Sequence, residues 1–240
     1  MRFAWEYNRA WISKTARKPE EKMDFAAARS NMIENQIRAN RVIDARIVNA
    51  MASLPRERFV PKLKRGVAYM GDDLDVGNGR YLMNPMVMGQ LLESAEIKQS
   101  DVVLEIGAGS GYATAILSRL ASTVVAVESD ADLVRETTSL LGELGVDNAA
   151  VIEGKLNAGY AKQAPYDVIF INGAVAEVPA ELLAQIGEGG RLVAVVAGKV
   201  GLTGRIVVYT RSGSAIGHRE AFEAATHILP GFERRQAFVF

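Results

Sequence analysis

The sequence contains no cysteine, which excludes a disulfide framework, a thiolate metal site and a cysteine nucleophile. Histidine is scarce, and neither His218 nor His227 has neighbours at metal-ligand or catalytic-triad spacing. We therefore expect both imidazoles to lie on the surface or in apolar packing. The chain also lacks net charge, because 28 Lys and Arg residues balance 28 Asp and Glu residues. This balance gives no electrostatic reason to expect binding to nucleic acid or to a membrane.

Long apolar runs are missing as well. No run reaches the roughly 20 residues that span a bilayer, and no signal-like apolar region follows the N-terminus. We therefore expect a cytoplasmic protein. The acidic cluster of Asp72, Asp73 and Asp75 lacks the remainder of a calcium-binding loop, so we interpret it as a solvated turn and predict no metal site.

The most informative segment that is present is VVLEIGAGSGY, residues 102–112. Its β-branched, apolar run contains an acid, Glu105, and opens into three glycines spaced by two, Gly107, Gly109 and Gly111. Glycine permits positive φ and close approach of a ligand to the backbone, and a helix predicted over 112–120 presents free N–H groups at its N-terminus. The segment therefore predicts a cofactor cradle between a strand and a helix.

The spacing of the acid and the glycines discriminates between cofactors. A dinucleotide-binding turn reads G-x-G-x-x-G, whereas this turn reads E-x-G-x-G-x-G. The Glu105 carboxylate would repel the diphosphate of NAD, but it suits a cofactor with a cationic amino acid end. S-adenosylmethionine (SAM) meets this description, and we expect it as the cofactor. An NAD-binding protein and a glycine turn that binds nothing are the alternatives.

Strands and helices alternate after the glycine turn. The pattern predicts four further strands, at 124–128, 149–153, 166–172 and 191–197. It also predicts two helices, at 131–144 and 179–186. Such alternation is typical of a doubly wound α/β fold, a parallel sheet with helices on both faces. We also expect two antiparallel closing strands, at 204–210 and 218–225, with the turn between them at 211–213.

Three regions can be distinguished along the chain. Residues 1–22 mix basic and aromatic residues without a sustained period, and we expect a flexible N-terminal arm. Residues 23–95 are expected to form a helical and active-site loop subdomain. Residues 96–240 are expected to form the cofactor-binding α/β domain.

The predicted subdomain before the sheet has helices on both sides of a loop. Asp24 can cap a first helix, and a second helix is expected over 44–53. Residues 66–86 carry turn signals without a period, so we predict a long loop, which then leads into a helix over 85–93. Unstructured connections of that length are uncommon in compact domains unless they are functional.

Residues at the strand ends are expected to converge on one crevice. Glu128 lies about 20 residues after the glycine turn, where a doubly wound nucleotide fold places the acid that accepts hydrogen bonds from both ribose hydroxyls. The alternative interpretation of Glu128 is an exposed carboxylate at the end of a strand. Gly154, Lys155 and Leu156 follow the third strand, where adenine would lie. Asn172 ends the fourth strand, near the transferable methyl group. Ligands bind outside the carboxyl ends of parallel strands, so one ligand should touch all these positions.

The chain contains in order the segments ENQIRANRVIDARIVNAMASLPRERFVP, AYMGDDLDVGNGR, VVLEIGAGSGYATAILSRL, VVAVE, YDVIFINGA and GGRLVAVV. From Met23 onward this order resembles the protein-L-isoaspartate (D-aspartate) O-methyltransferase family. The resemblance implies a SAM-methyltransferase (Rossmann-like) fold and SAM-dependent methyl transfer to the carboxylate of isoaspartyl residues, a protein repair reaction. It also implies a cytoplasmic monomer whose partners are isoaspartyl-containing proteins or peptides.

The chain departs from the family pattern at two places. The family loop reads approximately G-x-G-Q-T-I-S-x-P, with a serine that contacts the reacting carboxylate region and the cofactor, whereas this chain reads GNGRYLMNP. Met83 takes the serine position and Tyr81 the threonine position, and a thioether cannot donate a hydrogen bond, so Tyr81 or Asn84 would have to supply a donor. After the third strand the family has G-D-G, whose aspartate accepts from adenine. Lys155 stands here and has donors only; we expect it to pair with a nearby acid such as Glu128 or Glu153.

These departures predict a weakened active site. Loss of a charge-assisted hydrogen bond costs roughly 1.5–3 kcal/mol, or about one to two decades of affinity. Three hypotheses stay open: a weakened isoaspartyl methyltransferase, a methyltransferase for another substrate, and a non-catalytic binding protein that retains the fold.

Overall fold

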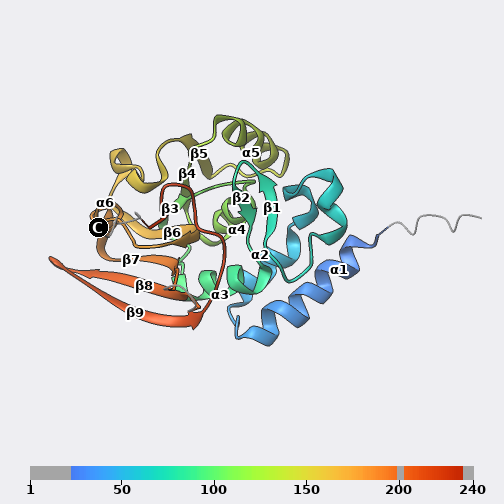
Figure 1. The fold of residues 1–240 in the computed structure, drawn as a ribbon, viewed down its shortest axis with the longest axis horizontal. Helices are drawn as coiled ribbons and strands as arrows, with labels where there is room; N and C mark the ends of the chain where they lie inside the picture. The colour runs from blue at the N-terminus through green and yellow to red at the C-terminus, as the bar shows by residue number, and fades with distance from the viewer. Residues whose placement is uncertain (1–22, 199–202, 235–240) are drawn as a thin grey trace, which may run out of the picture.

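The computed structural model describes residues 23–198 and 203–234, and a seven-stranded sheet forms its centre (Figure 1). In sheet order the strands are β5 (Ala149–Glu153), β4 (Thr123–Glu128), β3 (Val102–Ile106), β6 (Tyr166–Val175), β7 (Ile186–Val196), β8 (Arg205–Ser212) and β9 (Ala215–Glu223). The first five are parallel, and β8 pairs antiparallel with both β7 and β9. The doubly wound α/β prediction is confirmed. The strand order runs outward from β3 in both directions, which opens a crevice where β3 and β6 end.

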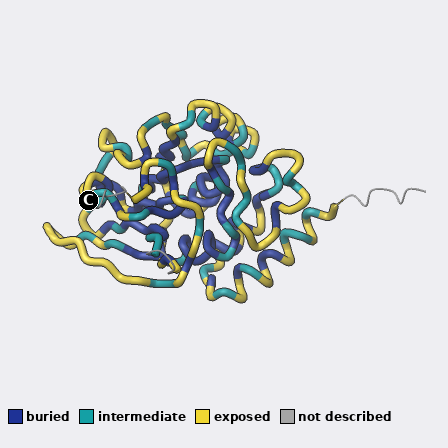
Figure 2. The backbone as a smooth tube through the Cα atoms, in the orientation of Figure 1, coloured by how far each residue is buried: buried dark blue, intermediate teal, exposed yellow. Residues whose placement is uncertain are grey.

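The two faces of the sheet are covered differently. One face packs against α3 (Pro85–Ala95), α4 (Tyr112–Leu120) and α5 (Ala131–Glu143). The other carries 3-10 turns, the short α6 (Ala180–Leu183) and residues 226–232. Figure 2 shows the strands between these layers as the buried centre of the molecule. The helix predicted over 179–186 is too long, because Ile186 already pairs with Tyr166 as the first residue of β7.

The N-terminal helices pack against the helical face of the sheet. Asp24 accepts hydrogen bonds from the backbone N–H groups of Ala26 and Ala27, both at 3.0 Å, so the predicted cap of α1 (Phe25–Met32) is confirmed. The helix continues through π and 3-10 turns to Asn40. The second predicted helix is α2 (Ala45–Ser53), capped by Asp44. The predicted arm, residues 1–22, lies outside the described residues.

The segment predicted as a loop over 66–86 contains a hairpin. Its strands are β1 (Leu74–Gly77) and β2 (Arg80–Leu82), and a 3-10 helix over Lys62–Val67 precedes them. Asn78 and Gly79 both have positive φ, 53° and 68°. Asn-Gly favours this left-handed pair of turn residues, so the dipeptide carried a hairpin signal that the loop prediction missed. The hairpin places Arg80 and the following residues against the sheet.

The closing strands are longer and closer together than predicted. β8 continues to Ser212 and β9 begins at Ala215, so the turn lies at Gly213, with a φ of 60°, and Ser214. β9 is largely exposed and extends away from the core together with β8 (Figure 2). Within residues 23–198 and 203–234, no helix has both the length and the apolar character to cross a membrane.

Candidate active site

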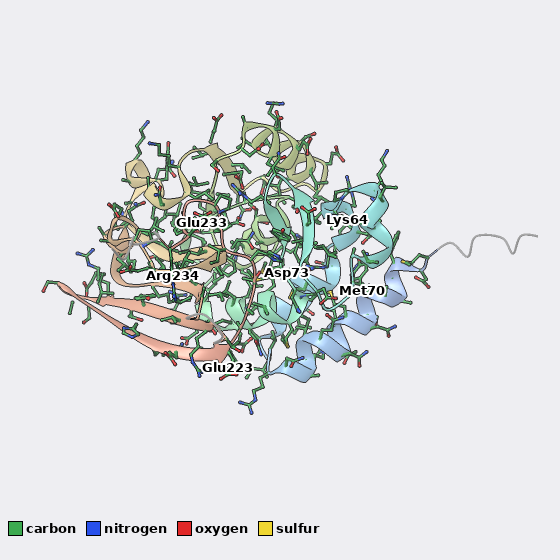
Figure 3. All side chains as sticks on the ribbon, viewed as in Figure 1. Lys64, Met70, Asp73, Glu223, Glu233 and Arg234 are labelled. Atoms are coloured by element: carbon green, nitrogen blue, oxygen red, sulfur yellow. The ribbon has the colours of Figure 1, made fainter. Side chains whose placement is uncertain are left out.

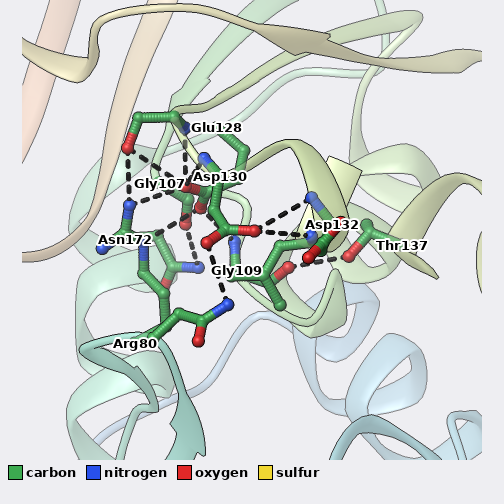
Figure 4. Close-up of polar contacts among 11 residues, drawn as sticks. Arg80, Gly107, Gly109, Glu128, Asp130, Asp132, Thr137 and Asn172 are labelled. Atoms are coloured by element: carbon green, nitrogen blue, oxygen red, sulfur yellow. Dashed lines mark hydrogen bonds and ion pairs between the residues drawn. The ribbon is translucent and has the colours of Figure 1, made fainter. Parts of the chain in front are cut away.

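The glycine turn between β3 and α4 is buried backbone without side chains at the end of the sheet. Gly107, Gly109 and Gly111 have φ values of 85°, 55° and 86°, a region that L side chains rarely adopt. A Cβ at Gly111 would lie only 2.6 Å from Cγ2 of Thr137 on α5. The Thr137 hydroxyl donates a 2.7 Å hydrogen bond to the Gly109 carbonyl (Figure 4). The turn is therefore held in shape by the neighbouring helix.

Glu128 ends β4 beside this turn and is fully buried. Its carboxylate accepts hydrogen bonds from the backbone N–H groups of Gly109 at 3.0 Å, Ser129 at 2.6 Å and Asp130 at 3.1 Å. Arg80 of β2 binds both oxygens, with Nε–Oε2 and Nη2–Oε1 distances of 3.0 and 2.6 Å (Figure 4). This paired geometry is the stronger form of an arginine–carboxylate contact. The acid predicted to hold the ribose is thus held by the protein's own guanidinium.

Arg80 is the main site residue that sequence reasoning missed. Only 4% of it is exposed, and it lies far from Glu128 in the sequence. The sequence contained only an indirect signal for Arg80: a buried acid at the end of a strand, such as Glu128, needs a cation or several hydrogen-bond donors beside it. No spacing rule identifies which of the many arginines supplies it.

Glu105 lies behind the crevice. Its carboxyl group is fully buried and accepts from the Thr114 hydroxyl at 2.6 Å and from Asn172 Nδ2 at 3.2 Å. Burial raises the pKa of Glu105 to about 8, and these two hydrogen bonds only partly offset the burial. Asn172 Nδ2 also donates to the Gly107 carbonyl at 3.0 Å, which ties the end of β6 to the glycine turn. The Asn172 Oδ1 atom is buried and finds no hydrogen-bond partner among the described residues.

The residues after β5 lie beside the end of β4 and do not line the crevice at the ends of β3 and β6. Gly154 donates a 2.9 Å hydrogen bond to the Glu128 carbonyl, and Leu156 is buried in the second apolar cluster. Lys155 between them is exposed. The expected ion pair of Lys155 with Glu128 or Glu153 is wrong: Glu128 is already paired with Arg80, and no contact joins Lys155 to Glu153.

The three loop residues predicted to be catalytic have different surroundings. Met83 is 1% exposed, and its carbonyl accepts a 2.7 Å hydrogen bond from the buried Arg56. Tyr81 stacks on His227, with 3.4 Å between ring centroids. Asn84 caps α3: its Oδ1 accepts from Met86 N–H at 2.8 Å while its Nδ2 donates to a backbone carbonyl. The amide of Asn84 is thereby engaged, and Met83 lies on the wall of the crevice.

Asp73 joins the hairpin region to the C-terminal part of the chain. One carboxylate oxygen accepts from the Thr226 hydroxyl at 2.6 Å and lies 2.9 Å from His227 Nδ1, and the other accepts from Asn84 N–H at 2.7 Å. The solvated-turn prediction is therefore wrong for Asp73, although Asp72 and Asp75 are exposed. His227 is half-exposed and packs on Tyr81, as expected of a surface or packed imidazole. In the part of the chain that the structure describes, no group of three or more His, Cys, Asp or Glu residues could hold a metal ion.

The crevice at the ends of β3 and β6 is nearly full. Its free volume is about 10 Å³, and its walls are formed by the hairpin, the glycine turn, the end of β6 and residues 226–229. A cavity of that size holds at most one water molecule, whereas small-molecule sites measure roughly 300–1,000 Å³. The polar groups nevertheless suit SAM. Asn172 Oδ1 needs a donor such as an ammonium group, and the Glu128 carboxylate could accept ribose hydroxyls in place of its contacts with Arg80. Gly107 has no side chain to obstruct a ligand.

The fold and the glycine turn define a class before any comparison is made. The sheet is mostly parallel, the motif E-x-G-x-G-x-G begins in its strand β3, and a buried acid ends the neighbouring β4. This combination is typical of the α/β proteins that bind a nucleoside-containing cofactor at a topological switch point.

Comparison with known proteins identifies the family. The family model of protein-L-isoaspartate(D-aspartate) O-methyltransferase matches residues 27–223. A protein-L-isoaspartate O-methyltransferase of Methanoculleus marisnigri is 42% identical over 166 residues, which cover 69% of this chain and 76% of the relative. One from an Anaeromyxobacter species is 35% identical over 202 residues, or 84% of this chain and 82% of the relative. The chain belongs to the protein-L-isoaspartate(D-aspartate) O-methyltransferase family.

Two solved structures share this fold. A protein-L-isoaspartate O-methyltransferase matches with a TM-score of 0.73 and 25% identity, over 85% of this chain and 66% of the solved chain. A Plasmodium falciparum structure in complex with S-adenosyl-L-homocysteine matches with a TM-score of 0.70 and 18% identity, over 84% of this chain and 97% of the solved chain. The second likeness is in the fold alone.

Proposed function

We propose that this chain is a SAM-dependent O-methyltransferase that esterifies the free carboxylate of isoaspartyl residues in damaged proteins. The observation that carries the proposal is the bare-backbone glycine turn beside the buried Glu128, in a chain of this family. Family membership supports the isoaspartyl acceptor, and the polar groups of the crevice support the cofactor.

The residues of the crevice have separate roles in this reaction. SAM, when bound, supplies an electrophilic methyl group on a sulfonium. Glu128 would accept the ribose hydroxyls, and Asn172 Oδ1 would accept from the ammonium group. Glu105 would not contact the cofactor itself; it would position the Asn172 side chain, because it accepts a hydrogen bond from the Asn172 amide.

The acceptor needs alignment more than activation. A carboxylate is ionised at neutral pH, so it attacks without a general base, and the protein contributes orientation and exclusion of water. Met83 at the family's serine position has no hydrogen to donate, and Lys155 offers no acceptor to adenine. We therefore propose slow turnover and weak cofactor binding.

Calorimetric titration with SAM and S-adenosylhomocysteine, followed by transfer of a labelled methyl group to an isoaspartyl peptide, tests the proposal. The matched control is the same peptide with a normal aspartyl linkage. Binding followed by transfer to the isoaspartyl peptide alone supports the proposal. Binding without transfer contradicts the acceptor, and absence of binding contradicts the cofactor and leaves a non-catalytic role.

One observation favours a second acceptor class. An open hollow of about 390 Å³ outside the crevice is lined by Asp72, Asp73 and His227, among others. Two carboxylates disfavour an anionic acceptor, and an imidazole beside Asp73 can take a proton from a hydroxyl acceptor, which needs a base. Methylation of a hydroxyl-bearing peptide that is lost in His227→Gln, with isoaspartyl transfer unchanged, would support this alternative.

We further propose that the chain acts as a cytoplasmic monomer without nucleic-acid or membrane partners. The balanced charge supports this proposal. Size-exclusion chromatography with light scattering tests the monomer, and cell fractionation tests the compartment.

A further inference from the structure

The residues after β9 form a strap over the crevice. We define the strap as Thr226–Phe232; in Figure 1 the dark red chain after β9 turns back across the molecule near the hairpin. Its backbone pairs with the end of β6: Ala174 N–H donates to the His227 carbonyl at 2.9 Å, and Leu229 N–H donates to the Ala174 carbonyl at 2.9 Å. The strap therefore extends the sheet at the edge where a cofactor would enter.

Leu229 fills the space above the glycines. Only 5% of it is exposed. A Cβ built at Gly107 would lie 3.0 Å from Leu229 Cδ2, and one built at Gly173 would lie 2.6 Å from Leu229 Cγ. The leucine thus packs directly on the two glycines that leave room at the ends of β3 and β6. A cofactor that lies along the Gly107 backbone would meet this side chain.

The strap is fastened to the hairpin by polar and aromatic contacts. Asp73 accepts from the Thr226 hydroxyl, the His227 N–H and His227 Nδ1. Tyr81 stacks on the His227 ring, with an interplanar angle of 5°. These contacts end at His227, two residues before Leu229, so they fix the position of the leucine side chain.

Arg80 occupies the second half of the crevice. Its guanidinium takes both oxygens of Glu128 and also donates to the Ser129 hydroxyl at 2.8 Å. Ribose hydroxyls would donate to the same carboxylate oxygens. Asn78, in the turn of the hairpin, donates to Asp130 Oδ2 at 2.8 Å, which holds the hairpin in this position.

We infer that the resting protein is closed on itself, with Leu229 of the strap and Arg80 of the hairpin standing in the places that the cofactor takes, so that cofactor binds only by displacing both. The inference rests on the proposed function for the identity of the cofactor. A ligand that binds only the open fraction of a protein has its affinity reduced by that fraction. Leu229 and Arg80 therefore lower the affinity of this site for the cofactor, because they favour the closed state.

S-adenosylhomocysteine is the probe, and binding is measured by calorimetry. Leu229→Ala removes the side chain above the glycines but keeps the strap backbone, and Arg80→Gln, the family's residue at that position, removes the cation from Glu128. We expect each variant to bind at least tenfold more tightly than the unmodified protein. The matched controls are Leu182→Ala, a buried leucine of the same apolar cluster on α6, and Arg191→Gln, whose guanidinium pairs with Asp101 at the amino end of β3. Neither control should tighten binding.

Hydrogen exchange supplies a readout that does not depend on affinity. The Ala174 and Leu229 amides are protected by the strap contacts, so saturation with S-adenosylhomocysteine should speed their exchange. The inference is overturned if saturation slows their exchange, or if both variants bind no more tightly than the unmodified protein. If the unmodified protein and both variants bind S-adenosylhomocysteine with the same affinity, the inference of a closed state fails but the proposed function is not contradicted. Absence of binding by the unmodified protein and by both variants rejects the inference and the cofactor together.

Discussion

The stability of the folded protein should fall across neutral pH because of one side chain, Glu105. Its pKa is raised from 4.5 to about 8 by complete burial. The folded protein therefore keeps this proton at pH values where the unfolded chain has released it. The free energy of unfolding then decreases as pH rises above 4.5, and the decrease ends above about pH 8. At 1.36 kcal/mol for each pH unit, the loss between pH 6 and pH 9 is about 3 kcal/mol.

The other resolved shifts of carboxyl and tyrosine groups lie outside this window. The pKa values of Asp44, Asp75 and Asp130 are lowered, so these groups titrate well below pH 6. The pKa values of Tyr69 and Tyr166 are raised to about 12. Among the described carboxyl and tyrosine groups with a resolved shift, Glu105 is thus the one that titrates between pH 6 and pH 9.

Urea unfolding at several pH values, in the unmodified protein and in Glu105→Gln, measures the effect. A glutamine keeps a carbonyl oxygen that accepts from the Asn172 amide, and its own amide can donate to the Thr114 hydroxyl, but it cannot ionise. The variant should therefore lose most of the dependence between pH 6 and pH 9. Glu153→Gln, at the exposed end of β5, is the matched control and should keep the dependence of the unmodified protein. Equal slopes in the unmodified protein and Glu105→Gln would refute the claim that this buried proton is held in the folded state.

Three further predictions concern the buried cations and the two family departures. Glu128→Gln should lower the free energy of unfolding by about 3–5 kcal/mol, because it leaves the Arg80 guanidinium buried without its partner; the double variant with Arg80→Gln should recover part of the loss in urea unfolding. Arg56→Met should cost about 2–4 kcal/mol in the same assay, since two buried carbonyls lose their donor, and a cost under 1 kcal/mol would contradict this role. Met83→Ser combined with Lys155→Asp should raise methyl transfer to an isoaspartyl peptide at least about tenfold, corresponding to about 1.4 kcal/mol; robust transfer by the unmodified protein would show that these residues do not impair the reaction.

Local signals in the sequence predicted much of the fold. The cap at Asp24, the helix over 44–53 and the strand-to-helix turn at 107–111 depend on residues within a few positions of one another. The structure contains all three, with Asp44 as the cap of the second helix. The hairpin was missed although Asn78-Gly79 carried its signal, because the strands around it are too short to show alternation. The length of α6 was missed because pairing of Ile186 with Tyr166 depends on tertiary structure.

The candidate site was less predictable, because its decisive contacts join distant parts of the chain. His227 lies 154 residues from Asp73 in sequence, and spacing rules for catalytic or metal sites do not reach that far. Arg80 pairs with an acid 48 residues away. The glycines and Glu128 could be placed from the pattern alone, whereas the groups that fill the space above them could not.

The three hairpin residues that differ from the family pattern all act on one crevice, so restoring the family reaction should require changing more than one of them. Where the family pattern has Gln, Thr and Ser, this chain has Arg80, Tyr81 and Met83. Arg80 reaches the ribose acid, Tyr81 stacks on the strap, and Met83 lies on the crevice wall. Substitution of Met83 alone adds a hydroxyl to a crevice that the other two contacts still keep closed. Residues that share contacts in one cavity have non-additive effects, so opening the strap should increase the gain from Met83→Ser.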